Sequence, residues 1–323
     1  MLAKIFIKIS QLYLNKINKS SKIRDFLTWP IASLILGKKY ENVVKLKNGL
    51  KMKTDLGDIL GRFVIFYGPK LNYFWEPQTT KLMEALARDA GQGIVAGAHI
   101  GYMALMAGKA MRREDSVLHS FEPVSYLYNI AKENFALNSD LGEMILNKKA
   151  LSDKSGEVEM SVDTLRSAII EDKSAVNTEK AEAVSIDDYA REMNIASLDF
   201  MLLDVEGHEP AVFSGMKNIL ARGKPRDIIF EYSQKVKGSF SDIDKYTEPL
   251  KPYGYRFYII KDNYKLENIK KDWGRVEIFE LEKNIDKFSE YSYFNVLATR
   301  RGEDKLRSLN IFLSSRVPRL RSG

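Results

Sequence analysis

Hydrophobic residues follow two different periods along this chain, and the alternation of the two periods predicts the fold. Short apolar runs, as long as buried strands, lie at residues 94–96, 117–121, 144–146, 198–203, 227–230, 256–260 and 294–299. Segments with helical spacing lie at residues 79–90, 102–111, 124–138, 185–193 and 210–220. Strand and helix alternate between residues 79 and 232, which predicts an α/β fold with a doubly wound, Rossmann-like parallel sheet.

The same pattern divides the chain into three parts. We expect an N-terminal extension over residues 1–76, a main domain over residues 77–299 and a basic tail over residues 300–323. The tail is expected to form a short helix followed by a frayed end. Within the main domain, residues 156–162 predict a short extended piece. Residues 163–182 are charged and weakly patterned, so we interpret them as a variable insertion.

The N-terminal extension itself predicts three elements. Residues 1–19 have the spacing of an amphipathic helix. Residues 41–55 predict a hairpin that turns at Asn48 and Gly49. Residues 56–76 are rich in Phe, Tyr and Trp and are expected to cap the sheet.

The first helix has an apolar face and a polar face. The apolar face consists of Leu2, Ile5, Phe6, Ile9, Leu12 and Tyr13, with Lys4, Lys8, Gln11 and Asn15 opposite. We expect the helix to dock on the domain and to leave its lysines in water. The alternative is a peripheral contact with a membrane.

Positive charge is concentrated at the two ends of the chain. The net charge is +7 over 323 residues. Residues 1–40 hold eight Lys or Arg and one acid, residues 300–323 hold seven and two, and the middle is mildly acidic. This distribution argues against a nucleic-acid groove in the body of the protein, and it permits basic ends that lie on an anionic surface.

Cysteine usage and hydropathy exclude several classes of protein. The chain has no cysteine, so disulfides, thiolate metal sites and cysteine nucleophiles are excluded. Lys4 and Lys8 interrupt the early apolar residues, unlike a secretory signal, and residues 26–37 are too short an apolar stretch to span a bilayer. We therefore expect a cytoplasmic protein. Any contact with a membrane is expected to be peripheral.

A glycine turn and a carboxylate predict a nucleoside-binding crevice. Gly97 and Gly101 follow the strand at residues 94–96 and begin a helix. Glu122 follows the next strand, where a carboxylate can accept both hydroxyls of a ribose. Because the carboxyl ends of parallel strands share one edge, the turn and the carboxylate are expected to meet there.

A second polar cluster follows the strand at residues 198–203. Asp204, Glu206, His208 and Glu209 come directly after this strand and before a helix, and Glu231 ends the next strand. Their position at the predicted ligand-binding edge favours a catalytic role over helix capping.

The three histidines do not form a clear metal set. His99 lies in the glycine turn and is expected to face a ligand, whereas His119 lies within a strand and is interpreted as a core residue. Oxygen ligands from Asp204, Glu206 and Glu231 could bind a magnesium-type ion. Because carboxylates beside a cofactor often only orient hydroxyl groups, we predict no metal.

The order of these motifs resembles the FkbM family of S-adenosylmethionine-dependent methyltransferases. The similarity runs from about residue 67 to residue 231. It rests on Gly97-Ala98-His99-Ile100-Gly101-Tyr102, Phe121-Glu122-Pro123, Asn134 with Asn138, Ala150-Leu151-Ser152, Asp204-Val205-Glu206-Gly207-His208-Glu209, and Glu231. The resemblance implies a seven-stranded class I methyltransferase sheet whose last strand is antiparallel.

The resemblance also implies roles for individual residues. Gly97, Ala98, His99 and Gly101 would cradle the methionine end of S-adenosylmethionine. Glu122 and Pro123 would lie at the ribose, and Ala150 and Leu151 would flank the adenine. Asp204, Glu206 and His208 are the candidates for the base that removes a proton from the acceptor, in that order.

The chain departs from the family pattern at three positions. The first motif usually reads Asp-Val-Gly-Ala-Asn-x-Gly, and here Val95 replaces its acid and His99 its asparagine. Leu202 replaces a lysine that usually precedes the Asp-Val-Glu-Gly motif. The missing acid would help to hold the ammonium group of the cofactor, so His99 and a nearby carboxylate would have to substitute.

The sequence thus leads to one function and two alternatives. We expect O-methylation of a sugar hydroxyl in a glycan, glycolipid or related metabolite, for instance in polysaccharide biosynthesis. A degenerate methyltransferase fold that serves as a binding or scaffold protein is the first alternative. An NAD-dependent oxidoreductase is the second, although the turn lacks the Gly-x-Gly-x-x-Gly spacing.

Overall fold

The computed structural model describes residues 2–14, 29–37, 41–162, 177–233, 242–260, 262, 274–288 and 293–314. The predicted insertion at residues 163–182 therefore lies largely outside the described residues. The prediction is wrong for its last residues, because Thr178–Ser185 forms a strand, β8. This strand pairs with β6 (Lys149–Ser152) and β7 (Gly156–Ser161) in a small three-stranded sheet.

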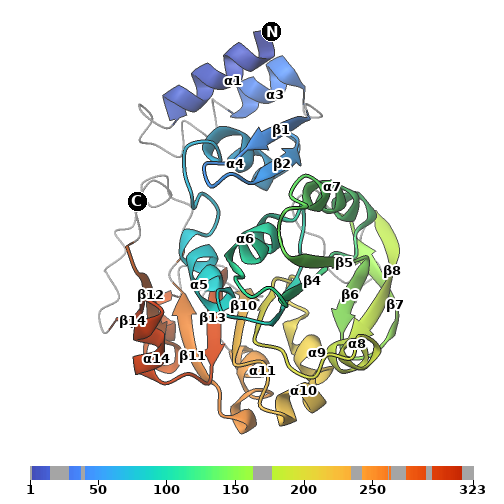
Figure 1. Ribbon diagram of the computed structural model, residues 1–323, viewed down its shortest axis with the longest axis vertical. Coiled ribbons are helices and arrows are strands. Elements are labelled where there is room, and N and C mark those ends of the chain that lie inside the picture. The colour runs from blue at the N-terminus through green and yellow to red at the C-terminus, as the bar shows by residue number, and fades with distance from the viewer. Residues whose placement is uncertain are drawn as a thin grey trace.

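A nine-stranded mixed sheet forms the centre of the protein (Figure 1). Its strands are β3 (Gln92–Ala96), β4 (Val117–Phe121), β5 (Glu143–Asn147), β9 (Phe200–Leu203), β10 (Asp227–Ser233), β11 (Arg256–Ile260), β12 (Val276–Glu280), β13 (Tyr293–Thr299) and β14 (Ile311–Leu313). Their order is β14-β12-β11-β13-β10-β9-β3-β4-β5. The strands from β5 to β10 are parallel, and β13 is antiparallel to both β10 and β11.

The predicted class I methyltransferase sheet is contained within this larger sheet. Its seven strands run from β5 to β11, with β13 as the antiparallel strand. The expected total of seven strands is too low, because β12 and β14 extend the sheet at one edge. The short helix predicted in the tail is present at Glu303–Ser308 (α14), and it is followed by β14, an unpredicted strand that pairs with β12. The end expected to fray falls on residues 315–323, outside the described residues.

Alternating residues of the central strands enter two separate hydrophobic clusters, one on each face of the sheet. In β3, Val95 belongs to one cluster, whereas Ile94 and Ala96 belong to the other. The helices α5 (Pro77–Ala87), α6 (Tyr102–Ala110) and α7 (Ser125–Ala136) pack on the Val95 side. The helices on the opposite side are α8 (Ile186–Glu192), α9 (Glu209–Ser214), α10 (Lys217–Ala221) and α11 (Ile243–Thr247).

The predicted helix at residues 210–220 is interrupted. The chain forms α9 and α10 with a break at Gly215. A Cβ atom at Gly215 would lie 2.3 Å from the carbonyl oxygen of Ser152, so only glycine permits this close approach to β6. The break in the helix therefore follows from its packing on β6.

The remaining short elements are a 3₁₀ turn at Lys251–Tyr253, a helix at Leu281–Asn284 (α13) and a 3₁₀ turn at Ile285–Phe288.

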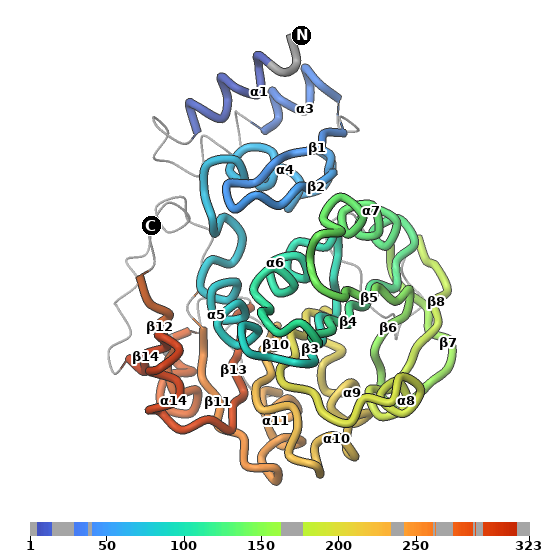
Figure 2. The backbone as a smooth tube through the Cα atoms, in the orientation of Figure 1, coloured from blue at the N-terminus to red at the C-terminus, as the bar shows by residue number. Residues whose placement is uncertain are grey.

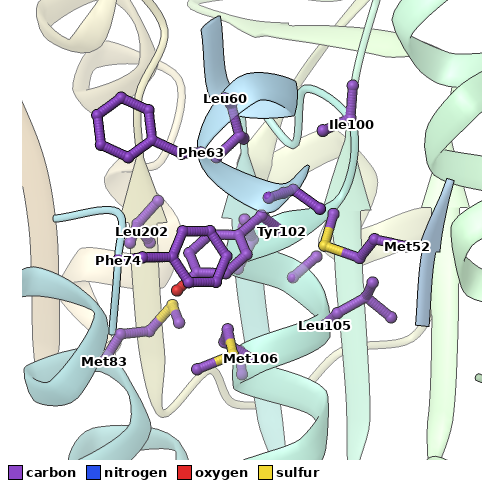
Figure 3. Packing of buried hydrophobic residues seen from close by; sticks show 14 of the residues in the cluster. Met52, Leu60, Phe63, Phe74, Met83, Ile100, Tyr102, Leu105, Met106 and Leu202 are labelled. Atoms are coloured by element: carbon purple, nitrogen blue, oxygen red, sulfur yellow. The ribbon is translucent and has the colours of Figure 1, made fainter. Parts of the chain in front are cut away.

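The N-terminal extension packs against the main domain. It consists of α1 (Leu2–Leu12), α3 (Trp29–Leu36), the predicted hairpin of β1 (Asn42–Lys45) and β2 (Lys51–Thr54), and α4 (Ile59–Tyr67). Figure 3 shows Met52 and Phe63 of the extension in one cluster with Tyr102 and Met106 of α6 and Leu202 of β9. The aromatic cap expected over residues 56–76 is thus part of the core.

Asn134 of α7 and Asn138, two residues beyond its end, hold the hairpin on the domain, and Figure 2 shows α7 and β2 side by side. The Asn138 amide accepts from the backbone N–H of Lys51 and donates to its carbonyl, at 2.9 and 2.7 Å. The Asn134 amide pairs in the same way with Lys53, at 2.5 and 3.0 Å. The two asparagines are four positions apart in the chain, and their partners, Lys51 and Lys53, are alternate residues of β2.

The first helix docks on the domain, as expected, but only part of its predicted apolar face takes part in the contact. Ile7 and Leu14 are buried, and Gln11 Nε2 donates to the carbonyl of Ile65 in α4 at 2.7 Å. Ile9 and Leu12, which belong to the predicted apolar face, are more than half exposed. Phe6 and Tyr13, from the same predicted face, are partly buried and pack against the core, and Lys8 is exposed as expected. The predicted apolar face is therefore divided between the core and the surface.

Candidate active site

The predicted site residues lie in one row along the carboxyl edge of the sheet. Ala96 of β3 pairs with Phe121 of β4 and with Leu203 of β9. The residues that follow these three, Gly97, Glu122 and Asp204, therefore leave the sheet at the same level. Phe230 of β10 pairs with Leu203, so Glu231 continues the row, opposite Asn295 of β13.

The glycine turn has the geometry that its sequence predicts. Gly97 has φ +73°, and a Cβ atom there would lie 1.8 Å from the carbonyl oxygen of Asp204. The N–H groups of Gly97 and Ala98 both donate to the carbonyl of Phe121, at 3.0 and 2.9 Å. Gly101 has φ +92° and is the N-cap of α6. These contacts fix the turn between the ends of β4 and β9.

Glu122 is buried and is held by the backbone around it. Its Oε2 accepts from the N–H of His99 at 2.8 Å, and its Oε1 accepts from the N–H of Val124 at 3.0 Å. Burial raises the pKa of this carboxyl to about 7, and the two N–H groups and His99 limit the increase. Each oxygen retains capacity for a further donor such as a ribose hydroxyl. Pro123 follows it and is partly exposed.

His99 is held by a carboxylate of the N-terminal extension. Its Nε2 lies 3.1 Å from Oδ2 of Asp58, whose Oδ1 caps α4 by accepting from the N–H of Gly61 at 2.6 Å. Burial of the ring opposes protonation, but Asp58, Glu122 and Asp204 outweigh it, so the pKa of His99 is raised. The other ring nitrogen, Nδ1, is buried and has no hydrogen-bond partner among the described residues.

The sequence did not reveal the role of Asp58. The only local signal was that Asp58 precedes a helix, which predicts a cap. Its contact with His99 spans 41 positions and depends on how the hairpin docks. The two residues together supply a carboxylate and an imidazole near Glu122, where the usual acid of the first motif is missing.

Asp204 and Glu206 begin an acidic loop. Asp204 follows β9, and its N–H donates to the carbonyl of Ala96 at 3.1 Å. Glu206 and Gly207 both have positive φ, at +54° and +93°, so the loop turns sharply before α9. The structure thus places these two predicted catalytic residues beside the glycine turn.

Three further carboxyl groups surround this loop. Oε1 of Glu209 accepts from the N–H of Val205 at 3.0 Å, and burial, with the charges of Asp204 and Glu206, raises its pKa to about 8. Burial and the neighbouring acids also raise the pKa of Glu231. Glu76, which the sequence analysis missed, accepts from Asn295 Nδ2 at 2.9 Å. Its signal was weak, since it only precedes the proline that begins α5.

The described residues do not support a magnesium site at this edge. Among them, no three acidic, histidine or cysteine side chains are arranged as ligands of one ion. The carboxyl groups of Asp204, Glu206, Glu209, Glu231 and Glu76 are here called the acidic rim.

The other two histidines face different surroundings. Nε2 of His208 lies 2.9 Å from Oγ of Ser152 on β6. His119 contacts the Tyr189 hydroxyl and the Gln92 amide through its two ring nitrogens, at 2.9 and 2.8 Å. Burial lowers the pKa of His119 to about 4, so it is a neutral core histidine, as predicted. Ala150 and Leu151, expected to flank the adenine, are buried in β6 next to the end of β5.

A family comparison identifies the domain that carries this site. The model of the FkbM methyltransferase domain matches residues 96–257, which is half of the chain. The protein belongs to the FkbM methyltransferase family. An FkbM protein is an S-adenosylmethionine-dependent methyltransferase, so the row from Gly97 to Glu231 is part of its methyltransferase domain.

Solved structures with similar folds share little sequence with this FkbM protein. A SAM-dependent methyltransferase from Agrobacterium tumefaciens is 11% identical, with 81% of this chain and 70% of that chain covered and a TM-score of 0.45. An O-methyltransferase from Bacillus cereus in complex with SAH is 10% identical, with 92% and 99% covered and a TM-score of 0.40. The O-methyltransferase TomG from Streptomyces achromogenes is 11% identical, with 71% and 83% covered and a TM-score of 0.39. No protein of curated function matches the sequence.

Proposed function

We propose that this FkbM protein methylates a hydroxyl oxygen of a sugar or a related metabolite. The observation that carries the proposal is the position of Asp204, which leaves β9 at the level of Gly97 and Glu122. A carboxylate there lies beside the cofactor crevice and within the same edge as the acidic rim. A hydroxyl acceptor needs such a base, because its proton must be removed as the oxygen is methylated.

The cofactor crevice fits S-adenosylmethionine in its donor set. Glu122 presents carboxylate oxygens for the ribose hydroxyls, and the unpartnered Nδ1 of His99 is a buried polar atom beside it. We assign the methionine end to Gly97, Ala98, His99 and Gly101, Pro123 to the ribose side, and Ala150 and Leu151 to the adenine side. When bound, S-adenosylmethionine supplies a methyl group on a positively charged sulfur, so the acceptor mainly needs alignment and loss of its proton.

The carboxyl groups of the acidic rim are assigned two roles, one as the base and the others as groups that orient the acceptor. A carboxyl group with a pKa of about 8, such as Glu209, is mostly protonated at pH 7 and carries no charge there. Burial and the neighbouring acids raise the pKa of Glu231 in the same direction. We assign the proton-accepting role to Asp204 first, then to Glu206 and His208. The rim then orients the neighbouring hydroxyls of a polyhydroxylated acceptor.

Two alternative functions, a degenerate scaffold and an oxidoreductase, have less support. The degenerate scaffold draws support from Val95, where the family motif has an acid, but the pairing of Asp58 with His99 restores a carboxylate near the turn. The family match favours methyl transfer over the nicotinamide-dependent oxidoreductase.

Transfer of labelled methyl from S-adenosylmethionine to a panel of glycans tests the proposal. We expect label in a methyl ether on a sugar oxygen. We expect Asp204→Asn to retain S-adenosylhomocysteine binding and to lose activity by about 100-fold or more. Asp140→Asn, an exposed carboxylate on the surface, is the matched control and should keep full activity. Label on nitrogen or carbon would overturn O-methylation, and full activity of Asp204→Asn would move the base to Glu206 or His208.

A further inference from the structure

Exposed apolar side chains are concentrated on α1, α3 and β1, here called the N-terminal layer. Seven large exposed hydrophobic residues lie there, namely Ile5, Ile9, Leu12, Ile31, Leu34, Ile35 and Val43. In the rest of the described chain only Tyr126 and Met193 are comparable. Leu34 is 85% exposed and Ile9 is 61% exposed. A cluster of this kind indicates a surface that contacts another molecule.

Two helices hold these side chains in place. On α1 the exposed residues are spaced at 5, 9 and 12, and on α3 they are spaced at 31, 34 and 35, so each set forms one helical face. The opposite faces are buried on α4: Trp29 packs edge-on against Phe63 at 5.3 Å, and Gln11 donates to Ile65. Figure 1 shows α1 and α3 as the outermost layer, beyond α4 and the hairpin.

Charge indicates what covers this surface. Residues 1–40 carry eight Lys or Arg and a single acid, and Lys8 is exposed on α1. An anionic lipid surface offers apolar chains for the aliphatic residues and negative headgroups for Lys8 beside them. A second copy of the chain would bring two strongly basic segments together, which their mutual repulsion opposes.

We propose that the exposed faces of α1 and α3, here called the α1–α3 face, lie on an anionic membrane in the plane of its headgroups. Among the described residues, no helix is long and apolar enough to cross a membrane, so the contact is with one surface. The α1–α3 face lies on helices that pack on α4, and the N-cap of α4, Asp58, contacts His99 of the cofactor turn. The proposal does not depend on the acceptor of the methyl group.

Co-sedimentation of the full chain with vesicles tests the α1–α3 face. The vesicles contain phosphatidylcholine with roughly one third phosphatidylglycerol, and pure phosphatidylcholine vesicles are the comparison. We expect binding to the anionic vesicles that weakens at high salt, and much less binding to the neutral ones. Replacing Ile9 and Leu34 together by Ser should reduce the affinity about tenfold or more, because both side chains lose their apolar contact.

The matched control is Met193→Ser, which removes an exposed apolar side chain far from the N-terminal layer. It should bind vesicles as the wild type does. The double variant should keep the melting temperature and S-adenosylhomocysteine binding of the wild type, since both residues are exposed. Absence of vesicle binding, or equal binding by the double variant, would overturn the proposal. A wild-type dimer that the double variant dissociates, without vesicle binding, would assign the face to a second copy instead.

Discussion

Val95 and Leu202 are paired neighbours on the two central strands of the sheet. They face each other across β3 and β9, and both are buried in the same hydrophobic cluster. In the motifs that this chain resembles, these positions hold an acid and a lysine. Both charged residues are therefore replaced together, and the two apolar side chains leave no buried charge at this pair of positions. The change therefore need not disrupt the domain.

The first prediction concerns this pair. Val95→Asp should lower the free energy of unfolding by about 3–5 kcal/mol, because a carboxylate is then buried without a cation. Adding Leu202→Lys should restore a large part of the loss. Urea denaturation of the two single variants and the double variant measures this coupling. Additive losses would show that the two positions do not interact.

The second prediction concerns Asp58 and the protonation of His99. Asn also caps helices well, so Asp58→Asn should keep α4 but remove the carboxylate that raises the pKa of His99. Because that pKa is raised in the folded protein, the contact stabilises the protein below the ordinary value of 6.5 and loses this effect as pH rises through the folded pKa. The wild type should therefore exceed the variant in stability at pH 5.5 more than at pH 9.

Two measurements of unfolding free energy, one at each pH, give that difference. Imidazole NMR titration gives the pKa of His99 in both proteins. An unchanged pKa in Asp58→Asn would contradict the proposed pairing.

The third prediction concerns the buried carboxyl of Glu209. Its pKa of about 8 means that folding favours the protonated form, so the wild type loses stability as pH rises from about 4.5 through 8. Glu209→Gln keeps an oxygen for the N–H of Val205 and cannot ionise. Relative to wild type it should gain on the order of 3–5 kcal/mol at pH 9 and little at pH 4. A pH-independent difference between the two proteins would refute the raised pKa.

The fourth prediction concerns the glycine turn. Gly97→Ala places a methyl group against the carbonyl of Asp204 at positive φ, so we expect a loss of about 2–4 kcal/mol in stability and of cofactor binding. Gly156→Ala is the matched control, because a Cβ atom there would contact nothing within 4 Å. Thermal unfolding and titration with S-adenosylhomocysteine compare the two variants. Normal binding by Gly97→Ala would place the crevice elsewhere.

The sequence predicted that Gly97, Glu122 and Asp204 lie together, because parallel strands bring their carboxyl ends to one edge of the sheet. The sequence could not place Asp58 or Glu76, because their contacts join residues that are 41 and 219 positions apart. It also predicted the docked face of α1 only in part, because periodicity shows that a helix has an apolar side but does not show which of its residues meet the protein.

The direct test of the cofactor site is calorimetric titration of the wild type and of Glu122→Ala with S-adenosylhomocysteine, using NAD as a parallel control. We predict micromolar binding of S-adenosylhomocysteine alone to the wild type and its loss in Glu122→Ala. If the wild type bound neither molecule, or if Glu122→Ala bound S-adenosylhomocysteine normally, the proposed crevice between Gly97 and Glu122 would be wrong.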